Sequence, residues 1–400
     1  MTMNKVEVAD IFKAHIQDYL KVYQMPGEHY KIVYDIISCR TSYLGGHIEK
    51  CDHCGEERTS YNSCCNRHCP KCQCLAKERW LEKRKEELLP VRYFHTVFTI
   101  PHDINPVVLC NKGIMLKILF QSVSETLLQF GANPENKLGG KLGAILFLHT
   151  WDQTLLDHFH IHCLIPGGVL VEDGQWVPCP NNYLFPEKAL AQVFKGKFME
   201  YLSHAKKENR LIFPGNTGVM GTRTGFAKLE HTLWSKAWVV DTEDPIDKPE
   251  HVLEYVGRYT HRVAISNNRI VSLQDGKVTF TYKDRKQKTT RNMTIDAVEF
   301  IRRFLLHALP KKFMRIRHVG FLANRCKKEN LKRCREILNV PDVPIHENPS
   351  VQEMMLRLTG KDILRCRKCN KGRYIIVGQI PEQTGVNPFE IIHPLILSGG

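Results

Sequence analysis

The chain has 400 residues, of which 42% are hydrophobic and 25% charged, a globular composition with room for two or three domains. A formal net charge of +15 favours an anionic partner, and a nucleic acid ahead of a membrane surface. Charges are mixed throughout residues 1–20 and apolar runs such as 144–148 are short, so we expect no signal peptide, no membrane span and a cytoplasmic protein.

The first 90 residues predict helices around a cysteine-rich block. Residues 5–38 show two helical patterns, separated at 25–29. The block itself covers 39–74, and a charged helix follows at 75–89, where Pro90 ends it. Eight of the 15 cysteines lie between Cys39 and Cys74. In a cytoplasmic protein such clustering indicates metal ligands before disulfides.

The middle of the chain predicts an α+β domain with a mainly antiparallel sheet flanked by helices. A turn at Asp173-Gly174 marks a hairpin. Strand patterns cover 93–100, 142–151, 158–165, 263–266, 269–273 and 277–284, and helical patterns cover 106–130, 187–208, 249–262 and 296–309. From 340 on, the chain is irregular and basic. We therefore expect a helical, zinc-binding domain at 1–90, a catalytic domain at 91–310 and a basic C-terminal region at 311–400.

Two Cys-x2-Cys pairs in the block have the spacing of a zinc site of the zinc-ribbon type. Cys51 and Cys54 form the first pair, and Cys69 and Cys72 form the second after fourteen residues. Each pair supplies two thiolates from one tight turn, and the intervening loop can close a tetrahedron. We expect these four cysteines to hold one structural zinc ion.

Further potential ligands lie in the block and near the C-terminus. A second zinc site can be composed of Cys39, His47, Cys64 and His68, with Cys65 and Cys74 as spare thiols. Alternatively, these residues are buried thiols or histidines that contact phosphate. Cys366 and Cys369 offer half of a further zinc site, which Cys326 and Cys334 could complete. The alternative for that pair is an exposed turn with two thiols.

The segment "HFHIHCLI" predicts a strand with a histidine face. Residues two apart on a strand share a face, so His160 and His162 point the same way and can meet one divalent cation. His158 lies on that face and is a candidate third ligand. His149, on the preceding predicted strand, is another candidate.

The helix predicted at 249–262 carries two tyrosines and two arginines. Tyr255 and Tyr259 are four residues apart and share a face. Arg258 and Arg262 flank the same side, which gives a phosphate-binding arrangement with two nucleophiles in it. The plainer interpretation of the tyrosines is a packing pair.

Taken together, these motifs resemble the two-tyrosine rolling-circle transposases of bacterial insertion sequences, within the HUH (histidine–hydrophobic–histidine) single-strand DNA endonucleases. The resemblance rests on "NSCCNRHCPKCQ", "HFHIHCLIPGG", "YVGRYTHRVAISNNRI" and "GFLANR", which occur in the family's order. The family usually has proline where this chain has Phe159, and arginine where it has Cys65.

The resemblance implies a metal-dependent transposase that cleaves and rejoins single-stranded DNA. His160 and His162 would hold Mg²⁺ or Mn²⁺, and Tyr255 and Tyr259 would form 5′-phosphotyrosine intermediates in rolling-circle transposition. The implied partners are single-stranded or hairpin transposon ends and target DNA, with no membrane, in a nucleoid-associated bacterial protein. Two other interpretations are a zinc-bearing DNA-binding regulator without catalysis and a metal-dependent phosphoesterase that uses water.

Overall fold

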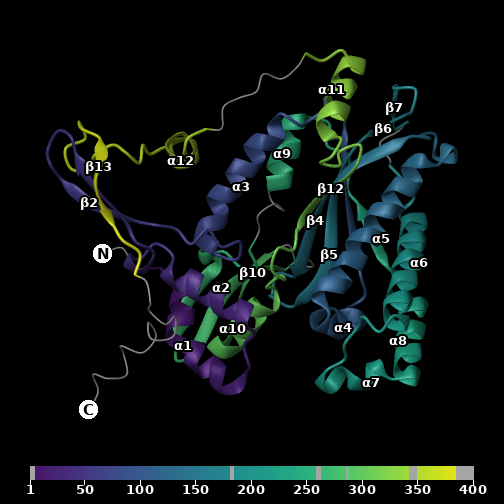
Figure 1. Cartoon of the computed structure of the whole chain (residues 1–400), viewed down its shortest axis with the longest axis horizontal. Helices are drawn as coiled ribbons and strands as arrows, with labels where there is room; N and C mark the ends of the chain where they lie inside the picture. The colour runs from purple at the N-terminus through teal and green to yellow at the C-terminus, as the bar shows by residue number, and fades with distance from the viewer. Residues whose placement is uncertain are drawn as a thin grey trace.

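The structure is a computed structural model, and it describes residues 5–180, 184–257, 263–284, 287, 289–341 and 349–383. Figure 1 shows a central sheet between two sets of helices, a helical group near the N-terminus, and an arm that projects away from both. Within these described ranges, no helix has the length and apolar character that crossing a membrane requires.

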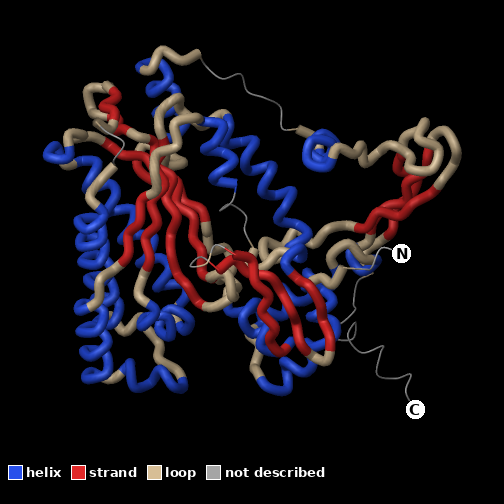
Figure 2. The backbone as a smooth tube through the Cα atoms, turned by 180° about the vertical axis from the view of Figure 1, so that it is seen from behind, coloured by secondary structure: helices blue, strands red, loops and turns tan. Residues whose placement is uncertain are grey.

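A seven-stranded sheet forms the centre of the molecule (Figures 1 and 2). Its strands run in the order β7-β6-β4-β5-β3-β8, with β12 also pairing with β4, and the pairs are antiparallel. The strands are β3 Tyr93–Thr99, β4 Lys141–Trp151, β5 Asp157–Pro166, β6 Gly168–Leu170, β7 Trp176–Pro178, β8 Val239–Thr242 and β12 Ile316–Gly320.

One face of the sheet is covered by helices and forms the largest core. Leu146 and Leu148 of β4 and Phe159 and Ile161 of β5 point into this core, in the alternation that a strand imposes. The helices on this side are α4 Asn105–Cys110, α5 Lys112–Ala132, α6 Glu187–Lys207, α7 Gly218–Gly221 and α8 Arg223–Ser235. The residues between these positions therefore point to the opposite face.

The opposite face has a smaller core under three other helices. Ile145, Phe147 and Leu164 of the sheet pack there with Val252 of α9 and with residues of α3 and α11. These helices are α3 Pro70–Lys85, α9 Pro249–Gly257 and α11 Lys327–Ile337. The same alternation continues this face into a group of histidines, so α3 and α9 cover the sheet beside them.

The N-terminal helices pack on a second, smaller sheet. Helices α1 Val8–Val22 and α2 Gly27–Ser38 share a core with α10 Ala297–Leu306 and with the sheet β11-β10-β9. Phe12 and Phe304 meet edge to face, with ring centroids 5.3 Å apart. The strands of this sheet are β9 Ile270–Gln274, β10 Lys277–Asp284 and β11 Thr289–Asp296.

A three-stranded sheet forms the arm, by which we mean residues 46–61 and 363–380. Its order is β13-β1-β2, so the last described strand lies beside the N-terminal hairpin. The strands are β1 Gly46–Cys51, β2 Glu57–Tyr61 and β13 Tyr374–Ile380, and helix α12 Val351–Thr359 precedes the arm. Both views show the arm extending away from the central sheet (Figures 1 and 2).

The predicted α+β fold with a mainly antiparallel sheet and a cysteine-bearing, helical N-terminal part is confirmed. The strand expected at 263–266 is wrong, because Ala264 and Ile265 are buried in a bend without strand pairing. The patterns missed β11, whose side chains are mostly exposed and polar. Strand β12 lies beyond residue 310 and joins the central sheet, while the domain limits at 90 and 310 stay predictions.

Candidate active site and cysteine clusters

Three buried histidines converge on the sheet face beneath α3 and α9, and we call them the histidine cluster. His149 of β4 lies directly across from His160 of β5, and His162 is two residues further along β5. One ring nitrogen from each lies within 4.8 Å of the others, and each residue is at most 5% exposed. Three imidazole nitrogens at this spacing can coordinate one divalent cation.

A backbone contact assigns the tautomer of His160. Its Nδ1 lies 2.8 Å from the carbonyl oxygen of His158. A carbonyl only accepts hydrogen bonds, so Nδ1 of His160 carries the proton and donates it. The unprotonated nitrogen is therefore Nε2, which is the state that a metal-binding histidine needs.

A chain of hydrogen bonds connects His162 to a tyrosine. Nδ1 of His162 lies 2.8 Å from Nε2 of His95, and Nδ1 of His95 lies 2.7 Å from the phenolic oxygen of Tyr255. The Tyr255 hydroxyl donates to the carboxylate of Glu243. With that direction fixed, each Nδ1–H donates to the next member, and Nε2 of His162 is left unprotonated for a metal.

Burial keeps the imidazole of His95 neutral, as the chain of hydrogen bonds from His162 to Tyr255 requires. The residue is 3% exposed, and desolvation lowers its pKa, while Glu243 and Asp241 act in the opposite direction. A lowered pKa means that the imidazole is neutral near pH 7. A neutral ring has one donor and one acceptor nitrogen, so His95 can accept from His162 and donate to Tyr255.

Local packing brings Tyr255 and Glu243 together at Nδ1 of His95. Val252 of α9 is fully buried against the sheet, and Tyr255, three residues on, shares its helical face. The Tyr255 ring meets His95 edge to face at 5.0 Å. Glu243 follows β8, and its backbone N–H donates to the carbonyl of His95 at 3.0 Å.

The structure brings together some of the predicted catalytic residues. His160 and His162 are joined by His149, whereas the ring of His158 stacks on that of His102 at 5.3 Å and is outside the cluster. The predicted residues Arg258, Tyr259 and Arg262 lie outside the described residues.

Sequence reasoning missed two members of the hydrogen-bonded chain. His95 lies in a strand that was predicted, on the face opposite Phe94 and Phe98, so its alternation was a usable signal. Glu243 lies just after the short strand β8 and carries no pattern that singles it out.

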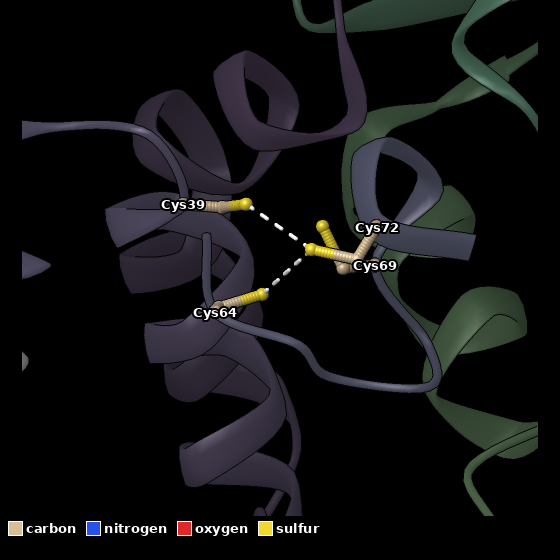
Figure 3. Close-up of side chains that lie close together, drawn as sticks. All are labelled: Cys39, Cys64, Cys69 and Cys72. Atoms are coloured by element: carbon tan, nitrogen blue, oxygen red, sulfur yellow. Dashed lines mark hydrogen bonds between the residues drawn. The ribbon is translucent and has the colours of Figure 1, made fainter. Parts of the chain in front are cut away.

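The first cysteine cluster lies where α2 and α3 meet, and we call it the base cluster. It consists of Cys39, Cys64, Cys69 and Cys72, whose sulfurs lie within 4.8 Å of one another (Figure 3). The Cys72 sulfur lies 3.5 Å from that of Cys39 and 3.6 Å from that of Cys64. Four thiolates at 2.3 Å from one zinc ion would be about 3.8 Å apart, so the donor set fits a tetrahedral site.

The second cysteine cluster lies in the arm, and we call it the arm cluster. It joins Cys51 and Cys54 to Cys366 and Cys369. The Cys51 and Cys369 sulfurs are 3.7 Å apart, and so are those of Cys54 and Cys366.

The expected grouping of Cys51, Cys54, Cys69 and Cys72 at one zinc ion is therefore wrong. The hairpin β1-β2 separates the two pairs, because Cys51 and Cys54 lie at its turn while the chain returns along β2 before reaching Cys69. A strand of five residues spans roughly 17 Å, which is too far for one coordination sphere.

The remaining predicted ligands lie outside both clusters. His47 contacts Glu49 at 3.3 Å, and His68 is partly buried, with desolvation lowering its pKa to about 3. Cys65 and Cys74 are exposed.

The proposed completion of the C-terminal pair by Cys326 and Cys334 is also wrong. Cys334 of α11 is buried in the core between this helix and the sheet, and Cys326 lies near the carbonyls of Gly320 and Ala323. Cys366 and Cys369 are instead completed by Cys51 and Cys54, which form the arm cluster with them.

Comparison with known proteins identifies the family. The chain is 41% identical over 391 residues to putative transposase y4qJ of Sinorhizobium fredii, which covers 96% of this chain and 98% of that protein. This chain belongs to the transposase family that includes y4qJ. It is also 26% identical over 308 residues to the transposase for insertion sequence element IS801 of Pseudomonas savastanoi pv. phaseolicola, over 76% of this chain and 73% of that one.

Two family models match separate parts of the transposase. A transposase zinc-binding domain matches residues 11–100 and a putative transposase model matches residues 143–330. All four cysteines of the base cluster lie within the zinc-binding match, which supports a structural zinc ion in this part of the chain. The histidine cluster and Tyr255 lie within the second match.

One solved structure shows a weaker likeness to the transposase. It is the conjugative relaxase TrwC in a metal-free complex with origin-of-transfer DNA, at 15% identity, over 62% of this chain and 73% of that chain. The TM-score is 0.23, so the family assignment rests on the sequence matches.

Proposed function

We propose that this transposase cleaves and rejoins single-stranded DNA at transposon ends through 5′-phosphotyrosine intermediates, in rolling-circle transposition. The observation that carries the proposal is the hydrogen-bonded chain from the histidine cluster through His95 to the phenol of Tyr255. Through His95, this chain of hydrogen bonds connects the phenol that would act as the nucleophile to residues that could hold a metal ion. The net charge of +15 supports a polyanionic substrate.

The histidine cluster is the part of the site that fits a divalent cation. His149, His160 and His162 would hold it through one nitrogen each, and for the last two that nitrogen is Nε2. Imidazole ligands suit Mn²⁺ better than Mg²⁺, which prefers oxygen and would take most of its ligands from water and phosphate. When bound, the cation would withdraw charge from the scissile phosphate.

The chemical step that we propose is an in-line displacement at phosphorus. The phenolic oxygen of Tyr255 attacks the phosphorus, the bond to the 3′ oxygen breaks, and that oxygen leaves as a 3′-hydroxyl after taking up a proton. The 5′ phosphate remains on the tyrosine. Attack by a 3′-hydroxyl on this linkage reverses the step, and because the phosphodiester energy is kept, rejoining needs no ATP.

Glu243 is the group that we propose takes the phenolic proton. A tyrosine hydroxyl has an ordinary pKa of about 10, so attack near pH 7 requires a proton acceptor. The Tyr255 hydroxyl already donates to this carboxylate, and the backbone of Glu243 is fixed to His95. His95 would keep the phenol in place by donating to its oxygen.

Glu243→Gln is expected to lower the cleavage rate by about 10²-fold, the lower end of the range for general base catalysis. DNA binding and folding should be unchanged, because Glu243 is half-exposed. The rate should rise more steeply with pH than in the wild type, since hydroxide must then remove the proton. Asp241→Asn, two residues earlier in β8, is the matched control, and wild-type rates in Glu243→Gln would exclude the proposed base.

Three further residues enter the proposal on the basis of their sequence positions alone: Arg258, Tyr259 and Arg262. A second nucleophile four residues after Tyr255 would let the protein hold two cleaved strands at once, or transfer one strand between the tyrosines. The two arginines would bind the phosphates that flank the cleaved bond, since guanidinium groups bind phosphate in a bidentate manner.

The test uses labelled single-stranded oligonucleotides that tile the DNA flanking the coding sequence, incubated with the full chain and Mn²⁺ or Mg²⁺. The expected result on a denaturing gel is a covalent protein–DNA band on a subset of the oligonucleotides and none on the matching duplexes. Cleavage without an adduct would indicate a phosphoesterase that uses water. Binding without cleavage would indicate a DNA-binding regulator.

A further inference from the structure

We propose that the arm cluster is a second structural zinc site, which joins the two ends of the described chain. The pair Cys51 and Cys54 comes from the turn after β1, and the pair Cys366 and Cys369 comes from the turn before β13. Only the first pair lies within the matched zinc-binding domain, and the second lies outside both family matches. The proposal does not rest on the strand-cleavage activity.

The sulfur positions fit a tetrahedral ion. The two sulfur–sulfur distances that span the two turns are both 3.7 Å, close to the edge of about 3.8 Å that four Zn–S bonds of 2.3 Å produce. A disulfide needs its sulfurs at about 2.05 Å. Disulfide formation between the two turns is therefore the poorer explanation for the convergence of four thiols.

The two turns have the same local backbone, although they are more than 300 residues apart. In each, the residue after the second cysteine donates its N–H to the carbonyl of the first cysteine, Gly55 to Cys51 at 3.1 Å and Asn370 to Cys366 at 3.0 Å. Both of these residues have positive φ, 73° and 55°. The left-handed conformation suits glycine and asparagine, so each turn has the residue that its geometry requires.

Backbone N–H groups point at the sulfurs, as thiolates require. Cys51 receives contacts from the amides of His53 and Cys54 at 3.4 and 3.5 Å, and Cys369 receives one from Gly372 at 3.4 Å. These donors stabilise the negative charge that a zinc-bound thiolate carries.

Gly372 shows how closely the two turns meet. A Cβ atom at this position would lie 2.6 Å from the sulfur of Cys51 and 2.4 Å from a carboxylate oxygen of Asp52. Neither contact is sterically tolerable, and the first would displace a ligand atom. Only glycine fits there while both turns keep their places.

The arm has almost no apolar core of its own to hold it together. Its buried apolar cluster consists of Cys51, Cys366 and Tyr374 with Cys369 against them. In contrast, Ile375 and Ile376 of β13 are 52% and 64% exposed. Small units without enough apolar burial depend on metals or disulfides, so the thiols themselves occupy the place where the arm's core would be.

The test is the zinc content of the full-length protein, measured by atomic spectroscopy after passage through a chelating column. Wild type should carry one zinc ion more than the double variant Cys366→Ser/Cys369→Ser. Taking the difference removes any contribution from the histidine cluster. Cys74→Ser, which changes an exposed cysteine outside both clusters, should lose none. Equal zinc in the wild type and the double variant would overturn the proposal.

A variant that keeps every cysteine separates metal binding from simple cysteine loss. Gly372→Ala should release one zinc ion per chain to a chelator at least tenfold faster than wild type does under the same conditions. The substitution should also expose residues 363–380 to proteases. If the cysteine variant fails to fold, titrating wild type with a thiol-blocking mercurial still decides the question. Release of two zinc ions per chain supports two sites, whereas release of one ion, or a denatured mass two hydrogen atoms lower per disulfide, contradicts the second.

Discussion

Replacing His149, His160 or His162 by alanine is expected to reduce strand cleavage by about 10³-fold or more while leaving DNA binding nearly unchanged. Charge stabilisation by a bound metal is worth several kcal/mol, and about 1.4 kcal/mol corresponds to each tenfold in rate. Binding draws on many basic side chains instead, so removing one neutral imidazole should cost little affinity. The measurements are adduct formation on a labelled single strand and a filter-binding isotherm.

His158→Ala is the matched control for this prediction. His158 lies on the same strand, and its ring packs against that of His160 with centroids 4.6 Å apart, but it is not a member of the histidine cluster. Its backbone carbonyl, which contacts Nδ1 of His160, survives the substitution. The affinity for Mn²⁺, measured by calorimetry, should fall in the three variants of the histidine cluster and should not change in His158→Ala. If His158→Ala lost the metal while His149→Ala kept it, the assignment of the third ligand would be reversed.

The parts of the site that the sequence predicts are those set by a short-range period. Alternation along β5 places His160 and His162 on one face, and the same rule applied to β3 would have placed His95 opposite Phe94. Which strands become neighbours depends on long-range pairing. That β3 lies beside β5, and so brings His95 to His162, is a property of the sheet order alone.

The cysteine clusters show the same limit more sharply. The sequence contains three Cys-x2-Cys pairs, and spacing favours joining the two nearest in the chain. The structure joins Cys51 and Cys54 to a pair more than 300 residues away, because β13 adds to the edge of β1. It joins Cys69 and Cys72 to Cys39 because α2 ends beside α3. Local pattern identifies the ligand residues, whereas the tertiary path of the chain decides their partners.

The cores explain why the catalytic face was only partly visible in the sequence. Phe147 of β4 and Leu164 of β5 fill the face beside the histidines, so the strands read as buried on both sides. The position that α9 takes over this face depends on Val252 packing against sheet and α3 residues from distant segments. A helical pattern at 249–262 predicts the shared face of its tyrosines, but not the surface that this face meets.

The tyrosine pair gives the second large effect. Tyr255→Phe keeps the ring that packs on His95 and removes the oxygen that bonds His95 and Glu243. The loss of a hydrogen bond costs about 1 kcal/mol of stability, so the variant should fold. Tyr259→Phe should fold as well, since it too keeps its ring.

If the two tyrosines act in sequence, each single variant should retain some cleavage of a single-stranded oligonucleotide and lose complete strand transfer in cells. The Tyr255→Phe/Tyr259→Phe double variant should form no covalent adduct, because both proposed nucleophilic oxygens are removed. A packing role for the pair predicts the reverse, with adduct formation intact in all three variants. The denaturing gel therefore separates the two roles, and an adduct in the double variant would show that the nucleophile lies elsewhere in the chain.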